Sequence, residues 1–353
     1  MPAVVAMSGG VDSSVAAALC ADARGAADVL GISLRLTSQP EGKERAGRSC
    51  CAPDDLYDAR RAAAAVGIPF YVFDAEERFR AEVIEPFIQS YARGETPNPC
   101  VRCNDHVKFD WLLERARKLG ADALVTGHYA RNVQQSDGTW SLQRARDPAK
   151  DQSYFLHGLT QEALQLVRFP LGDLTKEEVR SIARSRGLPN ADKPESMEVC
   201  FVGGEELPKF LERNGVAQTK GEIVDLSGRA LGEHGGVHHF TVGQRKGIGL
   251  SRKLPLYVAS LDASRQRVVV GTHEEVSRRA FEATSPRWTI APPEEGARCE
   301  VQIRHRGRPL PARLFADSGQ VRVELDEPAV GVAPGQSAVF YRGDAVLGGA
   351  QIV

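Results

Sequence analysis

The chain has 353 residues, of which 42% are hydrophobic and 26% are charged, and its formal net charge is −1. This composition is ordinary for a soluble globular protein, and the length allows two or three domains. No apolar run approaches the roughly 20 residues of a membrane span. We also expect no signal peptide, and the net charge gives no global sign of nucleic-acid binding. Seven scattered cysteines, an odd number, favour a reducing cytoplasm over a disulfide scaffold.

The first segment predicts a strand, a glycine turn and a helix. We expect a buried strand over 3–7, a tight turn over 8–13 and a helix over 14–21. A glycine pair between a strand and a helix lets backbone N–H groups surround an anion at the positive helix end. The turn has the sequence Ser-Gly-Gly-Val-Asp-Ser, which is neither a Walker loop nor the dinucleotide Gly-x-Gly-x-x-Gly pattern. It matches the pyrophosphate loop of enzymes that cleave ATP between its α and β phosphates, and Asp12 can orient a metal ion or the loop.

Strands and helices then alternate through about residue 130. We expect strands over 29–36, 69–73 and 123–126, and helices over 54–66, 76–93 and 109–119. Such alternation predicts an α/β fold with a doubly wound parallel sheet. Ligands of these sheets bind beyond the carboxyl ends of the strands, where the first loop and the Gly127-His128 pair would both lie.

The second half of the chain changes character. A capping-box pattern at Thr175–Glu178 predicts a helix that ends near Gly187. Short β-rich runs follow over 237–242, 256–261 and 267–270, and further runs over 298–303, 320–325, 337–341 and 345–352 have the spacing of a small barrel. We therefore expect an ATP-binding catalytic domain over 1–205, a β-rich central domain over 206–274 and a C-terminal β-barrel over 275–353.

Three cysteines have positions suited to sulfur chemistry. Cys100 and Cys103 have C-x-x-C spacing between two expected helices, and Cys200 precedes a glycine pair. A thiolate at a helix N-terminus is nucleophilic, and two thiols that meet across a cleft permit persulfide transfer followed by disulfide formation. We expect Cys20 and Cys299 to be inert buried thiols.

A local basic stripe lies near the C-terminal end. Residues 301–313 contain Arg304, His305, Arg306, Arg308 and Arg313 and no acidic residue. Such a stripe either contacts nucleic-acid phosphates or forms a solvated surface.

Several short motifs together resemble the bacterial tRNA-specific 2-thiouridylases. They occur in that family's order over essentially the whole chain: Ser8–Ser13, Thr96–Asn104, Thr126–Tyr129, Lys150–Tyr154, Cys200-Phe201, Thr241–Gly247 and Pro334–Tyr341. The resemblance implies an adenine nucleotide alpha-hydrolase-like catalytic domain. It also implies a cytoplasmic, monomeric enzyme that thiolates the wobble uridine of tRNAs for Lys, Glu and Gln. ATP, with Mg2+, would adenylate the C2 oxygen, and a persulfide from a cysteine desulfurase or a sulfur-relay protein would then supply sulfur.

The same resemblance implies roles for individual residues. Cys200 would carry the persulfide, and Cys103 would be the partner nucleophile. The nucleotide site would comprise Ala6, Met7, Ser8, Gly9, Gly10, Val11, Asp12, Ser13, Leu34 and Gly127. Contacts with tRNA would come from Asn98, Pro99, Cys100, His128, Lys150, Asp151, Gln152, Arg304, His305 and Gln336.

Alternatives to this chemistry stay open. Many members of the family have Asp where this chain has Cys100, so Cys100, Cys103 and Cys200 could instead ligate a 4Fe-4S iron–sulfur cluster. Cys50 and Cys51 could join Cys100 and Cys103 in a zinc site, although a position on a loop near the entrance is the simpler interpretation. The chain could also be an amidotransferase-like adenylating ligase, which would need neither Cys103 nor Cys200. An RNA-binding module with a vestigial nucleotide fold is the alternative outside the enzymes.

Overall fold

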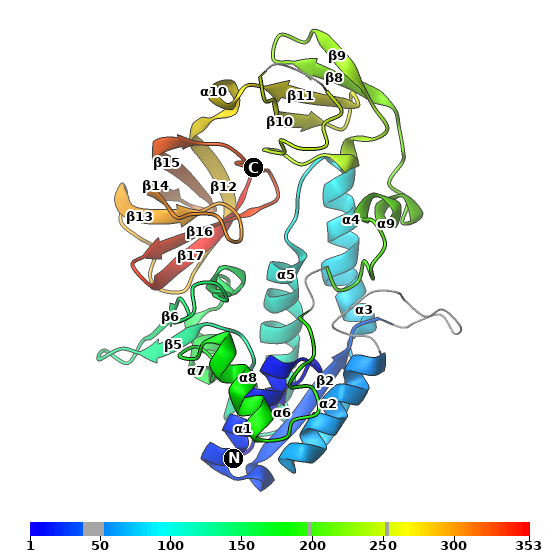
Figure 1. The fold of residues 1–353 in the computed structure, drawn as a ribbon. Helices are drawn as coiled ribbons and strands as arrows, with labels where there is room; N and C mark the ends of the chain where they lie inside the picture. The colour runs from blue at the N-terminus through cyan, green and yellow to red at the C-terminus, as the bar shows by residue number, and fades with distance from the viewer. Residues whose placement is uncertain (38–52, 196–198, 251–253) are drawn as a thin grey trace. The chain divides into compact units, whose positions relative to one another are not determined.

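The computed structural model describes residues 1–37, 53–195, 199–250 and 254–353 (Figure 1). These residues form two compact units, each discontinuous in sequence. The first unit comprises Met1–Ile84, Cys100–Glu205 and Asp344–Val346. The second comprises Glu85–Pro99, Glu206–Gly343 and Leu347–Val353.

A parallel sheet forms the centre of the first unit. Its strand order is β3-β2-β1-β4-β7, so the chain winds outward from β1 in both directions. The strands are β1 (Ala3–Ala6), β2 (Val29–Arg35), β3 (Phe70–Asp74), β4 (Ala123–Thr126) and β7 (Val167–Arg168). In the register, Ala6 is paired with both Ile32 and Thr126, so β1 and β4 end side by side while β2 continues to Arg35. The predicted doubly wound parallel sheet is confirmed.

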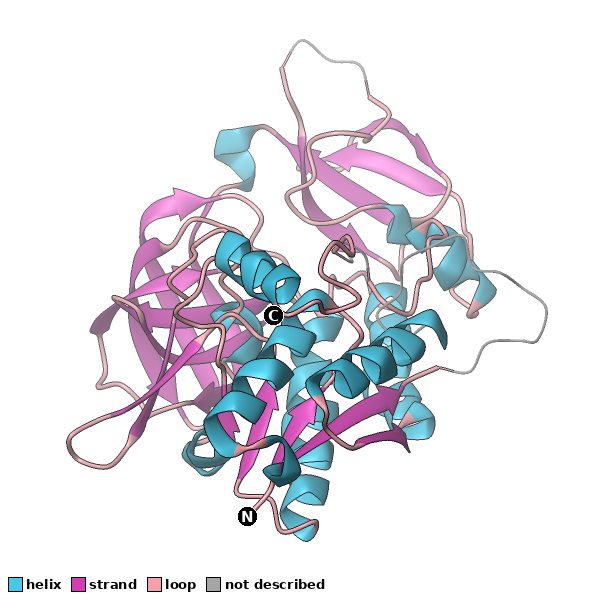
Figure 2. Cartoon of the chain, turned by 60° about the horizontal axis from the view of Figure 1, so that its bottom comes forward, coloured by secondary structure: helices cyan, strands magenta, loops and turns pink. Residues whose placement is uncertain are grey.

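Helices cover one face of this sheet with small apolar side chains. They are α1 (Val11–Arg24), α2 (Pro53–Val66) and α8 (Lys176–Ser185). Val15 and Ala62 pack with Val5 in one buried cluster, and Val179 of α8 joins it. Figure 2 shows the cyan helices in front of the magenta strands of this sheet. The alanines of α1 favour a helix and let it approach the strands closely. Only residues 7–10 separate the end of β1 from the start of α1, so the helix begins directly beyond the strand.

The remaining helices of this region differ in their bounds from the prediction. The segment predicted as one helix over 76–93 consists of α3 (Glu76–Phe79), the π-helix η2 (Arg80–Ile84) and α4 (Glu85–Ala92), of which α4 belongs to the second unit. The helix predicted over 109–119 begins earlier, as α5 (Pro99–Arg102), the π-helix η3 (Cys103–Leu112) and α6 (Leu113–Lys118). The other short elements are η1 (Ala26–Asp28), η4 (Ser153–Leu156) and α7 (Gln161–Leu166).

A hairpin extends the first unit. It pairs β5 (Arg131–Gln134) with β6 (Trp140–Gln143) in antiparallel register. Ala345, at the start of β17 (Ala345–Ile352), pairs with Gln143 of this hairpin.

The N-terminal part of the second unit contains a four-stranded sheet in the order β10-β11-β8-β9. Its strands are β8 (Gly221–Asp225), β9 (Ala230–His234), β10 (Tyr257–Asp262) and β11 (Arg267–Gly271). Helix α9 (Leu207–Arg213) precedes the sheet and α10 (His273–Val276) follows it. The expectation of a strand over 237–242 is wrong, because Val237–His239 form the 3-10 turn η5. Val237, His238 and Phe240 are all buried, which the alternating faces of a strand would not allow so readily.

The C-terminal part of the second unit is a closed barrel. The strands run in the order β12-β15-β14-β13-β16-β17, and β12 also pairs with β17. They are β12 (Arg278–Trp288), β13 (Ala297–Gln302), β14 (Leu310–Asp317), β15 (Gln320–Ala329), β16 (Ser337–Arg342) and β17. Alternate residues such as Leu310, Ala312 and Leu314 fill the interior. The predicted C-terminal barrel is confirmed.

Among the described residues, no helix combines the length and the apolar character that crossing a membrane requires.

Candidate active site

The loop between β1 and α1 is shaped for an anion. Gly9 has a φ of +76°, in the left-handed region, and a Cβ placed on it would lie 2.2 Å from the backbone oxygen of Asp55. Only glycine fits this position without strain. Gly10 is the N-cap of α1, and no side chain caps the helix there. The positive end of a 14-residue helix therefore points out of the loop.

Hydroxyl and amide groups hold the loop in this form. The backbone N–H of Ser8 donates to Oγ of Ser13 over 3.1 Å, and Ser13 donates back to the Gly10 carbonyl over 3.1 Å. The buried side chain of Asn190 donates to the carbonyl of Gly9 over 3.0 Å and to Oγ of Ser14 over 2.8 Å. The loop is thus pre-organised before any ligand arrives.

Lys193 supports the loop from the side of α2. Its ammonium group donates to Asp55 over 2.5 Å and to Asp58 over 2.6 Å, and it also reaches the carbonyl of Gly9 over 3.3 Å. Burial opposes the charge, but the hydrogen bonds to the two carboxylates prevail and raise the pKa of Lys193. Lys193 therefore remains charged and fixes Asp55 against the loop.

Asp12, the carboxylate of the loop, is bound by two side chains. Lys176, the first residue of α8, donates to its two oxygens over 2.7 and 2.8 Å. The hydroxyl of Tyr129 donates to the same carboxylate over 2.8 Å. Burial, followed by the charge of Asp12, raises the pKa of Tyr129 well above its ordinary range, so Tyr129 acts as a donor.

Glu195 continues this network. Lys176 lies 2.8 Å from its carboxylate and Lys150 lies 2.6 Å from it. Burial disfavours the charged form of Glu195, but the hydrogen bonds from Lys150 and Lys176 outweigh it and lower its pKa to about 2. Two ammonium groups and two carboxylates thus form a row that begins at the loop.

The end of β4 closes the other side of the loop. A Cβ on Gly127 would lie 2.7 Å from the backbone nitrogen of Ser13, so glycine is required for this approach. The ring of His128 lies between Phe109 and Phe169, with centroid separations of 5.9 and 6.1 Å. Desolvation, and then the nearby charge of Lys108, lower the pKa of His128 well below its ordinary value. Neutral His128 bonds Oγ1 of Thr126 over 2.8 Å.

The other residues predicted for the nucleotide site line the same strand ends. Ala6 ends β1, Leu34 lies near the end of β2, and Met7 is buried, with its N–H bonded to the Ile32 carbonyl over 2.8 Å. Val11 is buried in the first turn of α1. The structure therefore brings the predicted nucleotide-site residues together around the loop.

Asp151 and Gln152 have internal partners. Asp151 accepts hydrogen bonds from the backbone of Ala145 over 3.0 Å and from the hydroxyl of Ser153 over 2.9 Å. Gln152 accepts from the N–H of Tyr129 over 3.0 Å. Asp151 also lines a polar cavity of about 430 Å3, whose charged members are Arg131, Arg144, Arg146, Asp151, Asp173 and Asp344.

The predicted catalytic cysteines lie on segments that meet at α3. Cys103 is the first residue of η3 and is partly exposed, whereas Cys100 in α5 is exposed. Cys200 is partly exposed in a turn, and the ring of the following Phe201 packs edge-on against Phe79 of α3 with centroids 5.8 Å apart. Helix α3 also packs against η3. Cys50 and Cys51 lie outside the described residues.

The remaining predicted tRNA contacts belong to the second unit. Gln336 donates to the backbone oxygen of Thr96 over 2.7 Å, which fixes the segment that leads to Asn98 and Pro99. Arg304 is exposed and His305 is partly exposed in the turn after β13. These residues belong to the second unit, whereas Cys103, Cys200 and the Ser8–Ser13 loop belong to the first.

Sequence reasoning missed Lys176, Lys193, Glu195 and Asn190. Lys176 belongs to a segment whose pattern indicated only a helix cap: Thr175 accepts from the N–H of Glu178 over 3.2 Å, and Glu178 accepts from the N–H of Thr175 over 2.6 Å. The only available signal for Lys176 was its position as the first residue of a capped helix. This position does not indicate that its partner, Asp12, lies 164 residues away in the sequence.

Three protein-family models match successive parts of the chain. The family described as "tRNA methyl transferase HUP domain" matches residues 1–204. The "tRNA methyl transferase PRC-barrel domain" matches residues 208–272, and the "Aminomethyltransferase beta-barrel domain" matches residues 278–352.

Full-length relatives are also similar. The chain is 49% identical to the tRNA-specific 2-thiouridylase MnmA of Geobacter metallireducens, over 99% of this chain and 96% of the relative. It is 48% identical to the protein of the same name from Acidothermus cellulolyticus, over 100% of this chain and 97% of the relative. The corresponding protein of Rhodospirillum rubrum is 49% identical, over 99% of this chain and 95% of the relative.

Proposed function

Because the chain belongs to the family of tRNA-specific 2-thiouridylases, we propose that it replaces the C2 oxygen of the wobble uridine in tRNAs for Lys, Glu and Gln with sulfur. The observation that carries this proposal is the anion-binding loop with Asp12 held by Lys176 and Tyr129. It supports an enzyme that binds and cleaves ATP, which a passive RNA-binding module has no need to do. The proposed domains are 1–205, 206–274 and 275–353.

The first proposed step is adenylation. The C2 oxygen of the uracil attacks the α-phosphorus of ATP, the bond to the β-phosphate oxygen breaks, and pyrophosphate leaves. The uncapped start of α1 and the Ser8–Ser13 loop would hold the phosphates. Asp12 offers hard oxygen donors on a side chain that is 31% exposed, which fits magnesium. When bound, magnesium would neutralise phosphate charge.

Adenylation makes the second step feasible, because a carbonyl oxygen is a poor leaving group and a phosphate ester is a good one. The terminal sulfur of a persulfide on Cys200 attacks C2, and AMP departs with the original oxygen. Cys103 then attacks Sγ of Cys200, so that the transferred sulfur stays on the uridine and a Cys103–Cys200 disulfide forms. A thiol reductant restores both thiols, and a cysteine desulfurase or a sulfur-relay protein reloads Cys200.

A cluster-dependent thiolase is the second candidate. In that case Cys100, Cys103 and Cys200 would ligate iron. The observation that favours this candidate is the exposed position of Cys100, three residues before Cys103. The two candidates predict different metal requirements for the same product.

One experiment separates the candidates. Protein purified without oxygen is assayed for iron, for pyrophosphate release and for thiouridine in tRNA, using ATP and a persulfide donor. We expect iron-free protein to be active, and we expect Cys200→Ala and Cys103→Ala to release pyrophosphate without forming thiouridine. Cys299→Ala is the matched control, because burial raises the pKa of Cys299 to about 12 and its thiol is inert.

Each result has a defined meaning. Activity only in iron-containing protein would favour the cluster. Pyrophosphate release with ammonia incorporation, unaffected by the cysteine changes, would favour an amidotransferase-like ligase. No tRNA-dependent pyrophosphate release at all would contradict the proposal.

A further inference from the structure

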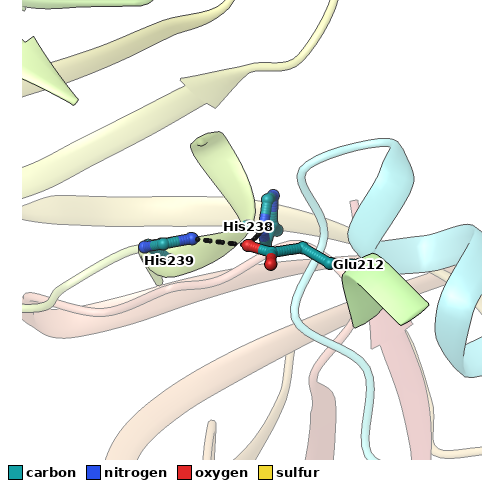
Figure 3. Close-up of side chains that lie close together, drawn as sticks. All are labelled: Glu212, His238 and His239. Atoms are coloured by element: carbon teal, nitrogen blue, oxygen red, sulfur yellow. Dashed lines mark hydrogen bonds and ion pairs between the residues drawn. The ribbon is translucent and has the colours of Figure 1, made fainter. Parts of the chain in front are cut away.

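A cluster of two histidines and a glutamate lies in the second unit, outside the site described above. Glu212 projects from α9, and His238 and His239 come from the 3-10 turn η5. Figure 3 shows the two imidazole rings directed at the same end of the Glu212 side chain. Of the described residues, these three form the only group of potential metal ligands whose donor atoms all lie within 4.8 Å of one another.

The distances within the cluster are short and similar. Nε2 of His238 lies 3.2 Å from Oε1 of Glu212, and Nε2 of His239 lies 3.3 Å from the same oxygen. The two rings are 4.5 Å apart, centre to centre, and cross at 73°. The tight turn of η5 allows these two consecutive residues to direct Nε2 toward the same oxygen.

These separations fit a tetrahedral metal centre. Ligand bonds of about 2.0–2.1 Å to zinc at tetrahedral angles place neighbouring donor atoms about 3.3–3.4 Å apart. Imidazole and carboxylate are ligands that zinc accepts, and a set of two histidines and one glutamate leaves one position open for water.

The surroundings suit a bound ion that is reachable from solvent. The side chain of His238 is only 2% exposed, whereas those of Glu212 and His239 are 28% and 35% exposed. One ligand is therefore anchored in the interior, and the other two face outward. An ion can enter from the outer side without unfolding of the unit.

We propose that Glu212, His238 and His239 bind one divalent cation of the zinc class, with water as the fourth ligand. The ion ties helix α9 to the turn η5 and so fixes the start of the segment 241–247. The ion takes no part in the sulfur chemistry.

The test measures the zinc content of the protein and does not depend on tRNA thiolation. Full-length protein freed of any histidine tag is stripped with a chelator, incubated with ZnCl2, passed through a desalting column and analysed for zinc per chain. We expect Glu212→Gln and His239→Gln each to retain one zinc ion per chain less than the unmodified protein, or to bind this zinc ion at least tenfold more weakly. His239→Gln is preferred because that side chain is partly exposed and the fold should survive.

Two controls keep the result specific. Cysteines can also hold zinc, but cysteine-bound zinc is unchanged in both variants, so the difference reports on this cluster alone. His273→Gln, in α10 of the same unit, should retain the full amount. Cobalt should add a visible absorption band that is lost in His239→Gln.

The contrary interpretation is that Glu212 merely accepts N–H bonds from the two imidazoles. It predicts equal zinc in all four proteins and no change in melting temperature on adding zinc. Either of those results in correctly folded variants would overturn the proposal. A rise in melting temperature that occurs in the unmodified and His273→Gln proteins, and not in the other two, would support it.

Discussion

The ammonium group of Lys176 lies 2.7 and 2.8 Å from the two carboxylate oxygens of Asp12, although 164 residues separate them in the chain. Asp12 is the only acidic residue of the loop, and Lys176 is only 12% exposed. A partly buried ion pair of this kind is costly to break from one side, because the remaining charge loses its partner. The start of α8 is thereby joined to the Ser8–Ser13 loop.

We expect Lys176→Met to reduce pyrophosphate release about 100-fold or more, a loss of the size found when one preorganised electrostatic group is removed from an active site. The variant keeps most of the apolar stem of the side chain and removes the ammonium group that donates to Asp12. Pyrophosphate release in the presence of tRNA is the measurement. Lys118→Met, in an exposed pair with Glu114 on α6, should have unchanged activity. Equal activity in both variants would show that Lys176 has no part in adenylation.

Gly9→Ala should destabilise the loop more than an equivalent change at Gly67. Both glycines have positive φ, but a Cβ on Gly9 meets the backbone of Asp55 at 2.2 Å, whereas a Cβ on Gly67 meets nothing within 4 Å. We expect Gly67→Ala to lower the free energy of unfolding by about 1–2 kcal/mol, the cost of left-handed backbone alone. Gly9→Ala should lower the free energy of unfolding by more than this. It should also abolish pyrophosphate release. Urea titration compares the two, and equal losses would contradict the close approach.

Glu195 should make stability depend on pH in the acid range. Its ordinary pKa of 4.5 is lowered to about 2 in the folded protein. A carboxylate with a lowered pKa stabilises the fold above its ordinary pKa, and that contribution disappears as the pH falls from about 4.5 towards 2. Glu195→Gln should therefore be less stable at neutral pH by about 1–2 kcal/mol, after allowance for solvent screening, and should lose less stability on acidification. Unfolding curves with parallel pH dependence in the two proteins would contradict this assignment.

Substitution of Arg304 tests whether the basic stripe over 301–313 contacts tRNA phosphates. If it contacts a phosphate, Arg304→Ala should weaken tRNA binding and reduce the slope of log affinity against log salt by about 1. Arg322→Ala removes a barrel arginine that is already paired with Glu324 over 2.5 Å, and its salt slope should stay unchanged. If both variants behave alike, the stripe is a solvated surface.

Local patterns predicted parts of both units well. The strand over 123–126 and the strand over 345–352 have the predicted bounds, and the glycine loop lies at the strand ends as expected. These features follow from hydrophobic runs and from glycine positions, which are properties of short segments.

Other strands escaped prediction for physical reasons. Strand β14 contains Pro311 and Arg313, and β12 contains Pro286 and several arginines, so both have the composition of an exposed loop. They form because barrel closure supplies partners on both sides, with Phe281 opposite Val323 and Ala283 opposite Ile352. Long-range pairing of this kind is absent from a local pattern, as is the contact between Lys176 and Asp12.

The discontinuous first unit has a consequence for protein synthesis. Asp344 pairs with Arg131 over 2.7 Å across 213 residues, and Ala345 pairs with Gln143 of the β5–β6 hairpin. At a ribosomal rate of about 5–20 residues per second, about 10–40 seconds pass between translation of Arg131 and of Asp344. During that interval the outer edge of β6 lacks this partner, so the nascent chain presents an open strand edge that chaperones could protect. The nucleotide-binding unit is therefore completed only after nearly all of the barrel has been made.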